Sequence, residues 1–314
     1  MCNYPLSLFR FIDGTSKICP TGTKSISYKG VTYSEPLLVP CGKCIECRLD
    51  YSRSWSFRMM CELDYHSCAS FLTLTYDDEH VPVSETNPLH LSLRKKDVQD
   101  FLKRLRKRLP DIHLSYYCCG EYGGRTMRPH YHMVLFGFYP DDAVFYKVNK
   151  FGDVMVKSEF LDSVWKQGFV TVGEVNKKTC GYVARYCTKK QVGINAVSTY
   201  DVFGIERPFS LASKRPAIGR RWVDDNIDKI ANFERVCIET DDGSFSIKPP
   251  KYFYDILSLT YPDVYAKIQL DNEVNAHLMS TVPRPDGLQG DFLYDYDEDA
   301  SYQKLKKLGN RGDI

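Results

Sequence analysis

Residues 128–137 read Arg-Pro-His-Tyr-His-Met-Val-Leu-Phe-Gly, an apolar run with two histidines near its start. Such a run is typical of a β-strand. Successive side chains of a strand point to opposite faces of a sheet, so His130 and His132 share one face. Two imidazoles on one face can bind a single metal ion. This stretch therefore predicts a strand that carries part of a metal site.

The sequence around this strand predicts an α+β fold. Strand patterns occur at residues 69–76, 113–120, 132–138 and 168–175. Amphipathic helix patterns occur at residues 95–109 and 157–167. Their β-α-β-β-α-β order is that of a ferredoxin-like or RRM-like antiparallel sheet backed by helices.

Three segments are expected along the chain. Residues 1–66 form an N-terminal Cys-rich segment, irregular up to residue 40, followed by a helix. Residues 67–192 form the α+β core. Residues 193–314 form an irregular C-terminal extension that is first basic and then acidic, since residues 291–299 carry five carboxylates and no cation.

Composition indicates a folded globular protein. The chain has 314 residues, of which 43% are hydrophobic and 26% charged, with a formal net charge of +2. No apolar run approaches the ~20 residues that cross a membrane, and no secretory signal is expected. Twelve cysteines without such a signal favour reduced thiols or a metal site over a disulfide framework.

A third metal ligand is predicted at Glu121. It ends the strand that precedes the Gly123-Gly124 turn and faces the same hairpin as His130 and His132. Two imidazoles and a carboxylate leave coordination positions open, which suits a catalytic divalent ion that also contacts a phosphate. The alternative is that both histidines are ordinary surface or core residues and that Glu121 is a solvated turn carboxylate.

Residues 177–190 predict a helix that carries two tyrosines on one face. Tyr182 and Tyr186 are four positions apart. The cations around them are Lys178, Arg185, Lys189 and Lys190. Nearby cations favour the phenolate form of a nucleophilic tyrosine. The alternative is that both tyrosines pack on the sheet.

Cys41, Cys44 and Cys47 form a CxxCxxC pattern. Structural zinc needs four ligands, so Cys2 or Cys19 is expected to complete the set. Three buried or partly reactive thiols and an iron–sulfur site are the alternatives.

The helix at residues 95–109, with its flank, is strongly basic. Residues 94–108 contain eight Lys or Arg residues against Asp97 and Asp100. A DNA backbone contact is expected from this imbalance, whereas a solvated charged face is the alternative. The predicted DNA-binding side chains are Arg104, Lys107, Arg108, Arg128, Lys178 and Lys190. A second basic cluster consists of Lys214, Arg215, Arg220 and Arg221.

These motifs resemble the HUH endonuclease superfamily, and within it the replication initiators of gokushovirus-like microviruses, which are small single-stranded DNA bacteriophages. Phe71-Leu-Thr-Leu-Thr75 resembles the first strand motif. Pro129-His-Tyr-His132 resembles the metal motif, with Tyr131 in place of an aliphatic residue. Tyr182-Val-Ala-Arg-Tyr186, followed by Lys189-Lys190, resembles the two-tyrosine motif. The Cys41–Cys47 element, with Arg48, Trp55 and Arg58, resembles the amino-terminal block of this phage branch.

The resemblance covers residues 40–190 and implies a rolling-circle replication initiator. Residues 67–192 would be the endonuclease core, with Tyr182, Tyr186 and Lys189 catalytic. His130, His132 and Glu121 would hold Mg²⁺ or Mn²⁺. The enzyme would nick single-stranded origin DNA, stay on the 5′ phosphate and later rejoin the strand.

The resemblance also implies partners and a location. A host helicase and DNA polymerase would act with the protein in the cytoplasm of the bacterial host, without a membrane. Three alternatives stay open. The first is a non-catalytic, zinc-containing single-stranded DNA-binding protein whose tyrosines stack on bases. The second is a nuclease that uses water, and the third is a relaxase or transposase of the same superfamily.

Overall fold

The computed structural model describes residues 2–149, 152–189, 196–232, 235–240, 243–280 and 303. The chain divides into two compact units. The first comprises Met1–Tyr51 with Pro283–Asp313, and the second comprises Ser52–Val282 with Ile314. Each unit is treated by itself below. The three predicted segments, with boundaries at residues 66 and 192, stay a prediction.

The first unit is built from short strands. β1 (Leu6–Arg10), β2 (Ser16–Cys19) and β5 (Leu37–Val39) form a sheet in the order β2-β1-β5, and β3 (Ser25–Tyr28) pairs with β4 (Val31–Ser34). The helix α1 (Ile45–Leu63) begins in this unit.

The prediction that residues 1–40 are irregular was therefore wrong. The strands of this segment have three to five residues and are largely exposed, so they leave little hydrophobic periodicity to detect. One local signal was present. Lys29 and Gly30 both have positive φ, 49° and 79°, in the two-residue turn between Tyr28 and Val31. This backbone is that of a type I′ hairpin turn, which favours glycine.

A seven-stranded sheet dominates the second unit, in the order β12-β7-β8-β6-β11-β10-β9. Every neighbouring pair is antiparallel. Its strands are β6 (Ala69–Tyr76), β7 (Ser115–Tyr122), β8 (Pro129–Phe136), β9 (Val144–Val148), β10 (Val154–Lys157), β11 (Gly168–Glu174) and β12 (Phe209–Ala212).

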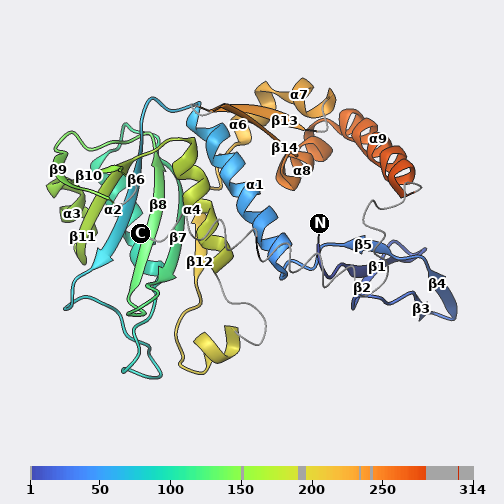
Figure 1. Ribbon diagram of the computed structural model, residues 1–314, viewed down its shortest axis with the longest axis horizontal. Coiled ribbons are helices and arrows are strands. Elements are labelled where there is room, and N and C mark those ends of the chain that lie inside the picture. Colours follow the sequence, from blue (N-terminus) through green and yellow to red (C-terminus); the bar gives the residue numbers. More distant parts are fainter. Residues whose placement is uncertain are drawn as a thin grey trace. The chain divides into compact units, whose positions relative to one another are not determined.

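Helices cover both faces of this sheet (Figure 1). α2 (Lys95–Arg108) and α3 (Glu159–Trp165) pack on one face, where the buried cluster includes Leu72, Met133 and Trp165. α4 (Lys177–Lys189) and the part of α1 from Trp55 to Leu63 pack on the other. We call these the α2/α3 face and the α4 face. Each strand supplies both, because its side chains alternate.

The mixed α+β class with a large antiparallel sheet is confirmed. The predicted strand at 69–76 coincides with β6, and the predicted helix at 95–109 ends one residue later than α2. Strands β9, β10 and β12 were missed. All five residues of β9 are exposed, so it has no alternation of buried and exposed positions that a sequence pattern could reveal.

Residues 196–280 are regular in large part, so the prediction of an irregular extension was wrong there. The elements after β12 are α6 (Arg220–Asp225), α7 (Ile227–Asn232), β13 (Val236–Thr240), β14 (Gly243–Ile247), α8 (Lys251–Thr260) and α9 (Pro262–Ser280). A π-helical turn, η1, spans Val197–Asp201.

A separate buried cluster holds these elements together. It joins Phe57 of α1 to Trp222 and Phe253, whose three rings contact one another. α6 and α7 have six residues each, too short for a helical period to stand out in the sequence. The acidic residues 291–299 lie outside the described part of the chain. Among the described helices, none is long and apolar enough to cross a membrane.

Candidate metal and tyrosine site

The predicted metal ligands meet on the α4 face, at the centre of the sheet. β8 lies between β7 and β6, and its histidines pair with both neighbours. His130 is opposite Glu121 on β7 and Thr75 on β6. His132 is opposite Cys119 and Thr73. Because directly paired residues point to the same face, the sheet register itself brings Glu121 to the two imidazoles.

The three ligands converge on one point. Nε2 of His130 lies 3.0 Å and Nε2 of His132 lies 3.4 Å from Oε1 of Glu121. The side chains are 20%, 7% and 12% exposed for His130, His132 and Glu121, so the group is largely shielded from water. The structure thus brings together a Glu/His/His group able to bind a metal ion.

Contacts behind the histidines orient them. Nδ1 of His130 lies 3.2 Å from the carbonyl oxygen of Arg128, which can only accept, so His130 donates through Nδ1. Nδ1 of His132 lies 3.1 Å from Oγ1 of Thr73. With Nδ1 protonated, the neutral ring of His130 directs the lone pair of Nε2 toward Glu121. This is how metal-binding histidines are held by their second nitrogen.

The charge state of the group also suits a cation. Burial raises the pKa of Glu121, but hydrogen bonds from His130 and His132 outweigh it and lower that pKa to about 2. The carboxylate is therefore ionised at neutral pH, and a proton or a cation must separate it from the two Nε2 atoms. Ligand atoms about 2.1 Å from an octahedral ion and at right angles lie about 3.0 Å apart. The Glu121–His130 separation of 3.0 Å fits that arrangement.

Both tyrosines of α4 lie beside this group. The ring of Tyr186 stacks on the imidazole of His132, with centroids 4.2 Å apart and an interplanar angle of 10°. The ring of Tyr182 meets Phe71 edge-on, with centroids 6.0 Å apart. The hydroxyl groups of Tyr182 and Tyr186 contact each other. The four-residue spacing therefore presents both phenols at one place.

The two tyrosines differ in environment. Tyr186 is buried, and its burial, followed by the neighbouring Tyr182 and Glu121, raises the pKa of its phenol above the ordinary value. Tyr182 is half-buried, and the guanidinium of Arg185 lies 5.8 Å from its ring centroid. Arg185 is the one predicted cation of this helix that the described side chains place. Those of Lys178 and Lys189, and the whole of Lys190, lie outside the described part.

The predicted DNA contacts on α2 lie on the α2/α3 face, away from the histidines. Arg104 donates from Nε and Nη2 to the carbonyl oxygens of Val164 and Trp165, at 2.7 and 3.0 Å. Arg108 donates to Oγ of Ser163 at 2.8 Å. Lys107 is exposed. Arg104 and Arg108 thus join α2 to α3, while Lys107 faces solvent.

Arg128 begins the metal-bearing strand and is anchored on its neighbour. Its guanidinium donates to the carbonyl oxygen of Tyr76 at 2.8 Å and to Asp78 at 2.6 Å. The backbone carbonyl of the same residue holds His130. Arg128 therefore supports the metal group, a role that charge counting did not suggest.

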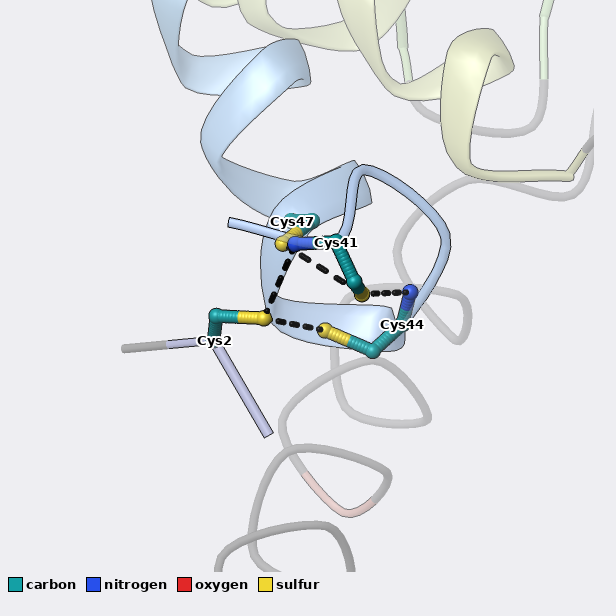
Figure 2. A group of neighbouring side chains, drawn as sticks. All are labelled: Cys2, Cys41, Cys44 and Cys47. Atoms are coloured by element: carbon teal, nitrogen blue, oxygen red, sulfur yellow. Dashed lines mark hydrogen bonds between the residues drawn. The ribbon is translucent and has the colours of Figure 1, made fainter. Parts of the chain in front are cut away.

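Four cysteines of the first unit also come together (Figure 2). The Sγ atoms of Cys2 and Cys44 are 3.8 Å apart, and those of Cys41 and Cys47 are 4.0 Å apart. All four sulfurs lie within 4.8 Å of one another. Of the two expected fourth ligands, Cys2 is the one present. Cys19 instead packs in a buried cluster with Phe9 and Phe11.

Backbone amides stabilise charge on two of these sulfurs. The N–H groups of Lys43 and Cys44 donate to Sγ of Cys41 at 3.4 and 3.3 Å, and the N–H of Cys41 donates to Sγ of Cys2 at 3.2 Å. Burial raises the pKa of the Cys41 thiol, but the hydrogen bonds outweigh it and lower that pKa to about 7. Such a thiol is readily deprotonated for metal binding.

Sequence reasoning missed Thr73 and Phe71, which contact His132 and Tyr182. The alternation in Phe71-Leu-Thr-Leu-Thr75 does place Phe71, Thr73 and Thr75 on one face. Only the register between β6 and β8 reveals that this face carries the histidines.

Comparison with known proteins gives a consistent result. The family model for replication-associated proteins of the ORF2 type matches residues 69–191. The replication-associated protein VP4 of Bdellovibrio phage phiMH2K is 33% identical over 245 residues, which cover 77% of this chain and 75% of that protein. The replication-associated protein ORF2 of Spiroplasma virus 4 is 33% identical, with 68% of this chain and 66% of that protein covered.

A third relative, the replication-associated protein ORF4 of Chlamydia phage 1, is 30% identical, with 79% of this chain and 61% of that protein covered. No solved structure matches the chain. The chain belongs to the family of phage replication-associated proteins, which confirms the resemblance drawn from its motifs.

Proposed function

We propose that this protein is a rolling-circle replication initiator that nicks single-stranded origin DNA and carries the 5′ end on a tyrosine. The central observation is the stacking of Tyr186 on His132 at 4.2 Å, which puts a phenol against the metal-binding group. The strand order β11-β6-β8-β7, with α2 and α3 on one face, supports a ferredoxin-like HUH core within residues 67–192. The role in replication is taken from the names of the relatives.

The reaction is a transesterification. The phenolic oxygen of Tyr182 or Tyr186 attacks the phosphorus of one phosphodiester, and the bond from phosphorus to the 3′ oxygen breaks. The phenol loses its proton, and the leaving 3′ oxygen gains one. The phosphotyrosine retains the bond energy, so a 3′ hydroxyl can later attack it and rejoin a strand without ATP.

His130, His132 and Glu121 would hold the divalent ion, Mg²⁺ or Mn²⁺. When bound there, the ion would supply Lewis acidity to the phosphate. Thr73 and the Arg128 carbonyl keep both imidazoles turned toward Glu121. The raised pKa of Tyr186 keeps its phenol neutral until a cation and a phosphate occupy the site. Lys189 remains proposed as a catalytic cation.

The contact between the two hydroxyls supports a role for both tyrosines at one phosphate position. One tyrosine would cut the origin first, and the other would cut the regenerated origin after one round. The expected partners are the single-stranded origin and, from the resemblance, a host helicase and DNA polymerase in the bacterial cytoplasm.

The test is a denaturing gel of the protein with labelled single-stranded origin DNA and Mg²⁺ or Mn²⁺. We expect a covalent protein–DNA band and a product with a free 3′ hydroxyl. Tyr182→Phe and Tyr186→Phe should each retain some cleavage, and the double variant should form no adduct. The phenylalanine rings preserve packing on Phe71 and His132, so folding is controlled for.

The same gel separates the alternatives. Cleavage that survives in the double variant would mean attack by water. DNA binding without any cleavage by the wild-type protein would leave a binding module whose tyrosines stack on bases. Either result would overturn the phosphotyrosine mechanism.

A further inference from the structure

The first inference concerns the four cysteines of the first unit. The sulfurs of zinc thiolates, about 2.3 Å from the ion at tetrahedral corners, lie about 3.8 Å apart. The observed separations of 3.8 Å for Cys2–Cys44 and 4.0 Å for Cys41–Cys47 match this edge length. They are too long for a disulfide, whose sulfurs are about 2.0 Å apart.

We propose that Cys2, Cys41, Cys44 and Cys47 bind one structural zinc ion, separate from the catalytic ion. Four thiolates leave no coordination position open, which is typical of structural sites. Cys44 immediately precedes α1 and Cys47 lies in its first turn, where helix N–H groups favour negative charge. The ion would tie residue 2 to the start of α1 and so close a loop that contains β1 to β5.

The first unit needs such a link because its own core is small. Among its described residues, the one apolar cluster has Phe9, Phe11 and Cys19 as its buried members. Ile12, Ile18 and Leu38 are exposed, at 88%, 60% and 64%. Small units with so little buried apolar surface are commonly stabilised by a metal or by disulfides.

Metal analysis of the purified full-length protein tests this inference. We expect about one zinc per chain that survives mild chelation, loss of that zinc in Cys2→Ser and Cys44→Ser, and retention in the matched control Cys19→Ser. Because a serine variant can misfold, cobalt is exchanged into the wild-type protein as a second measurement. Tetrahedral thiolate-to-cobalt charge transfer is the expected signal.

Metal-free protein with four freely reactive thiols would overturn the assignment, and so would bound iron with the absorption of an iron–sulfur cluster. Zinc lost from Cys19→Ser but kept by Cys2→Ser would refute the fourth ligand. All of these measurements are independent of cleavage.

A second inference comes from a row of side chains that crosses the sheet on the α4 face. Phe169 on β11 is paired with Thr75, Thr75 with His130, and His130 with Glu121. Phe169 therefore shares the face of the metal group and lies two strands from His130, roughly 10 Å away. It is 41% exposed.

The edge of the sheet beyond Phe169 carries a second exposed ring and two lysines. Nζ of Lys157 lies 4.2 Å from the ring centroid of Tyr146 and 5.9 Å from that of Phe169. Lys147 lies 5.4 Å from the Tyr146 ring. Tyr146 is 42% exposed. Lys157 thus stands between two exposed rings on the side of the sheet where the metal group lies.

Resting on the function proposed above, we infer that Phe169, Tyr146, Lys157 and Lys147 bind the single-stranded DNA flanking the cut phosphate. Exposed aromatic rings interleaved with cations fit unpaired bases and phosphates, because bases stack on rings regardless of sequence. An apolar protein partner would not complement the two lysines. The row leads from these rings to His130, so one strand can occupy both.

The opposite side of the same hairpin offers a matched control. Phe145 is 64% exposed and pairs with Val156, whose neighbour Val172 is buried in the α2/α3 cluster. Phe145 is therefore an exposed ring on the same strand as Tyr146 but on the other face of the sheet.

Fluorescence anisotropy with an uncleavable single-stranded oligonucleotide tests the surface. Phe169→Ala and Tyr146→Ala should each weaken binding roughly tenfold, and Phe145→Ala should leave it unchanged. Lys157→Gln should reduce the slope of log affinity against log salt by about 0.7. Wild-type affinity in the first two variants, or an equal loss in Phe145→Ala, would overturn the inference.

The covalent gel keeps this inference distinct from the proposed function. An adduct formed by wild-type protein, with unchanged binding in Phe169→Ala and Tyr146→Ala, would refute the surface alone. No adduct, with the expected losses of binding, would refute the phosphotyrosine mechanism and leave the surface standing.

Discussion

The two faces of strand β8 differ in what their side chains do, although they come from one run of residues. On the α4 face, His130 and His132 meet Glu121 and the stacked Tyr186. On the α2/α3 face, Tyr131 and Met133 are fully buried in the largest apolar cluster. The period of two thus lets one strand supply both the reactive groups and the core that holds them in place.

The contrast extends to how polar atoms are satisfied. On the α2/α3 face the hydroxyl of Tyr131 lies 2.7 Å from that of Tyr76, which donates to Asp97 at 2.6 Å, and it also donates to the carbonyl of Arg94 at 3.0 Å. These contacts are complete within the protein. On the α4 face, the Glu121 carboxylate faces two imidazoles and calls for a cation. A closed network stabilises the fold, whereas an open one can bind a ligand.

The largest expected effect is on the α4 face. His130→Ala and His132→Ala should each lower cleavage by at least about a thousandfold, because the ion's contribution to the transition state is several kcal/mol. Single-turnover cleavage is the measurement, with single-stranded DNA affinity recorded in parallel. Affinity should change little, since cationic surfaces supply most ground-state binding.

Glu121→Ala should behave like the two histidine variants. Wild-type activity in that protein would remove Glu121 from the ligand set. Equal losses of affinity and cleavage in the histidine variants would show that the imidazoles are structural, and the difference between the two faces of β8 would disappear.

The next effect is on the α2/α3 face and concerns stability. Tyr131→Phe removes one hydroxyl and leaves buried partners at Tyr76 and Arg94 unsatisfied, which should cost about 1–3 kcal/mol of unfolding free energy. Urea unfolding followed by circular dichroism measures it. Cleavage by the folded variant should stay within about threefold of wild type; a large loss would mean that the two faces are coupled.

A smaller effect is expected at Arg104, for which sequence reasoning predicted a DNA contact. Its guanidinium donates to two carbonyls at the end of α3, so Arg104→Met should lower the unfolding free energy by roughly 1–2 kcal/mol. DNA affinity is the second measurement. Weaker DNA binding without a change in stability would restore the original prediction.

How much the sequence reveals depends on periodicity. β6, β8, α2 and α4 were predictable because each alternates or repeats clearly over eight or more residues. The site residues on them followed from shared faces. Strands β1 to β5 and β9 were not predictable, since they are short and exposed.

Long-range pairing set the other limit. Nothing local in residues 69–76 indicates that Thr73 holds His132, or that Phe169 lies in register with His130 through Thr75. Charge counting likewise could not tell Arg104, which joins two helices, from exposed Lys107. Those distinctions depend on which elements become neighbours, and only the folded chain determines that.

Lys107 provides the smallest and most discriminating test. It is exposed on α2, on the face opposite the histidines. If α2 contacts the DNA backbone, Lys107→Gln should weaken binding of every sequence alike and reduce the log–log salt slope by about 0.7, the value for one lost single-strand contact. Lys157→Gln serves as the comparison on the α4 face. A reduced slope in Lys157→Gln alone would confine DNA to the α4 face. Equal reductions in both variants would mean that the strand passes around the sheet, and the division of labour between the two faces would then apply to chemistry but not to binding.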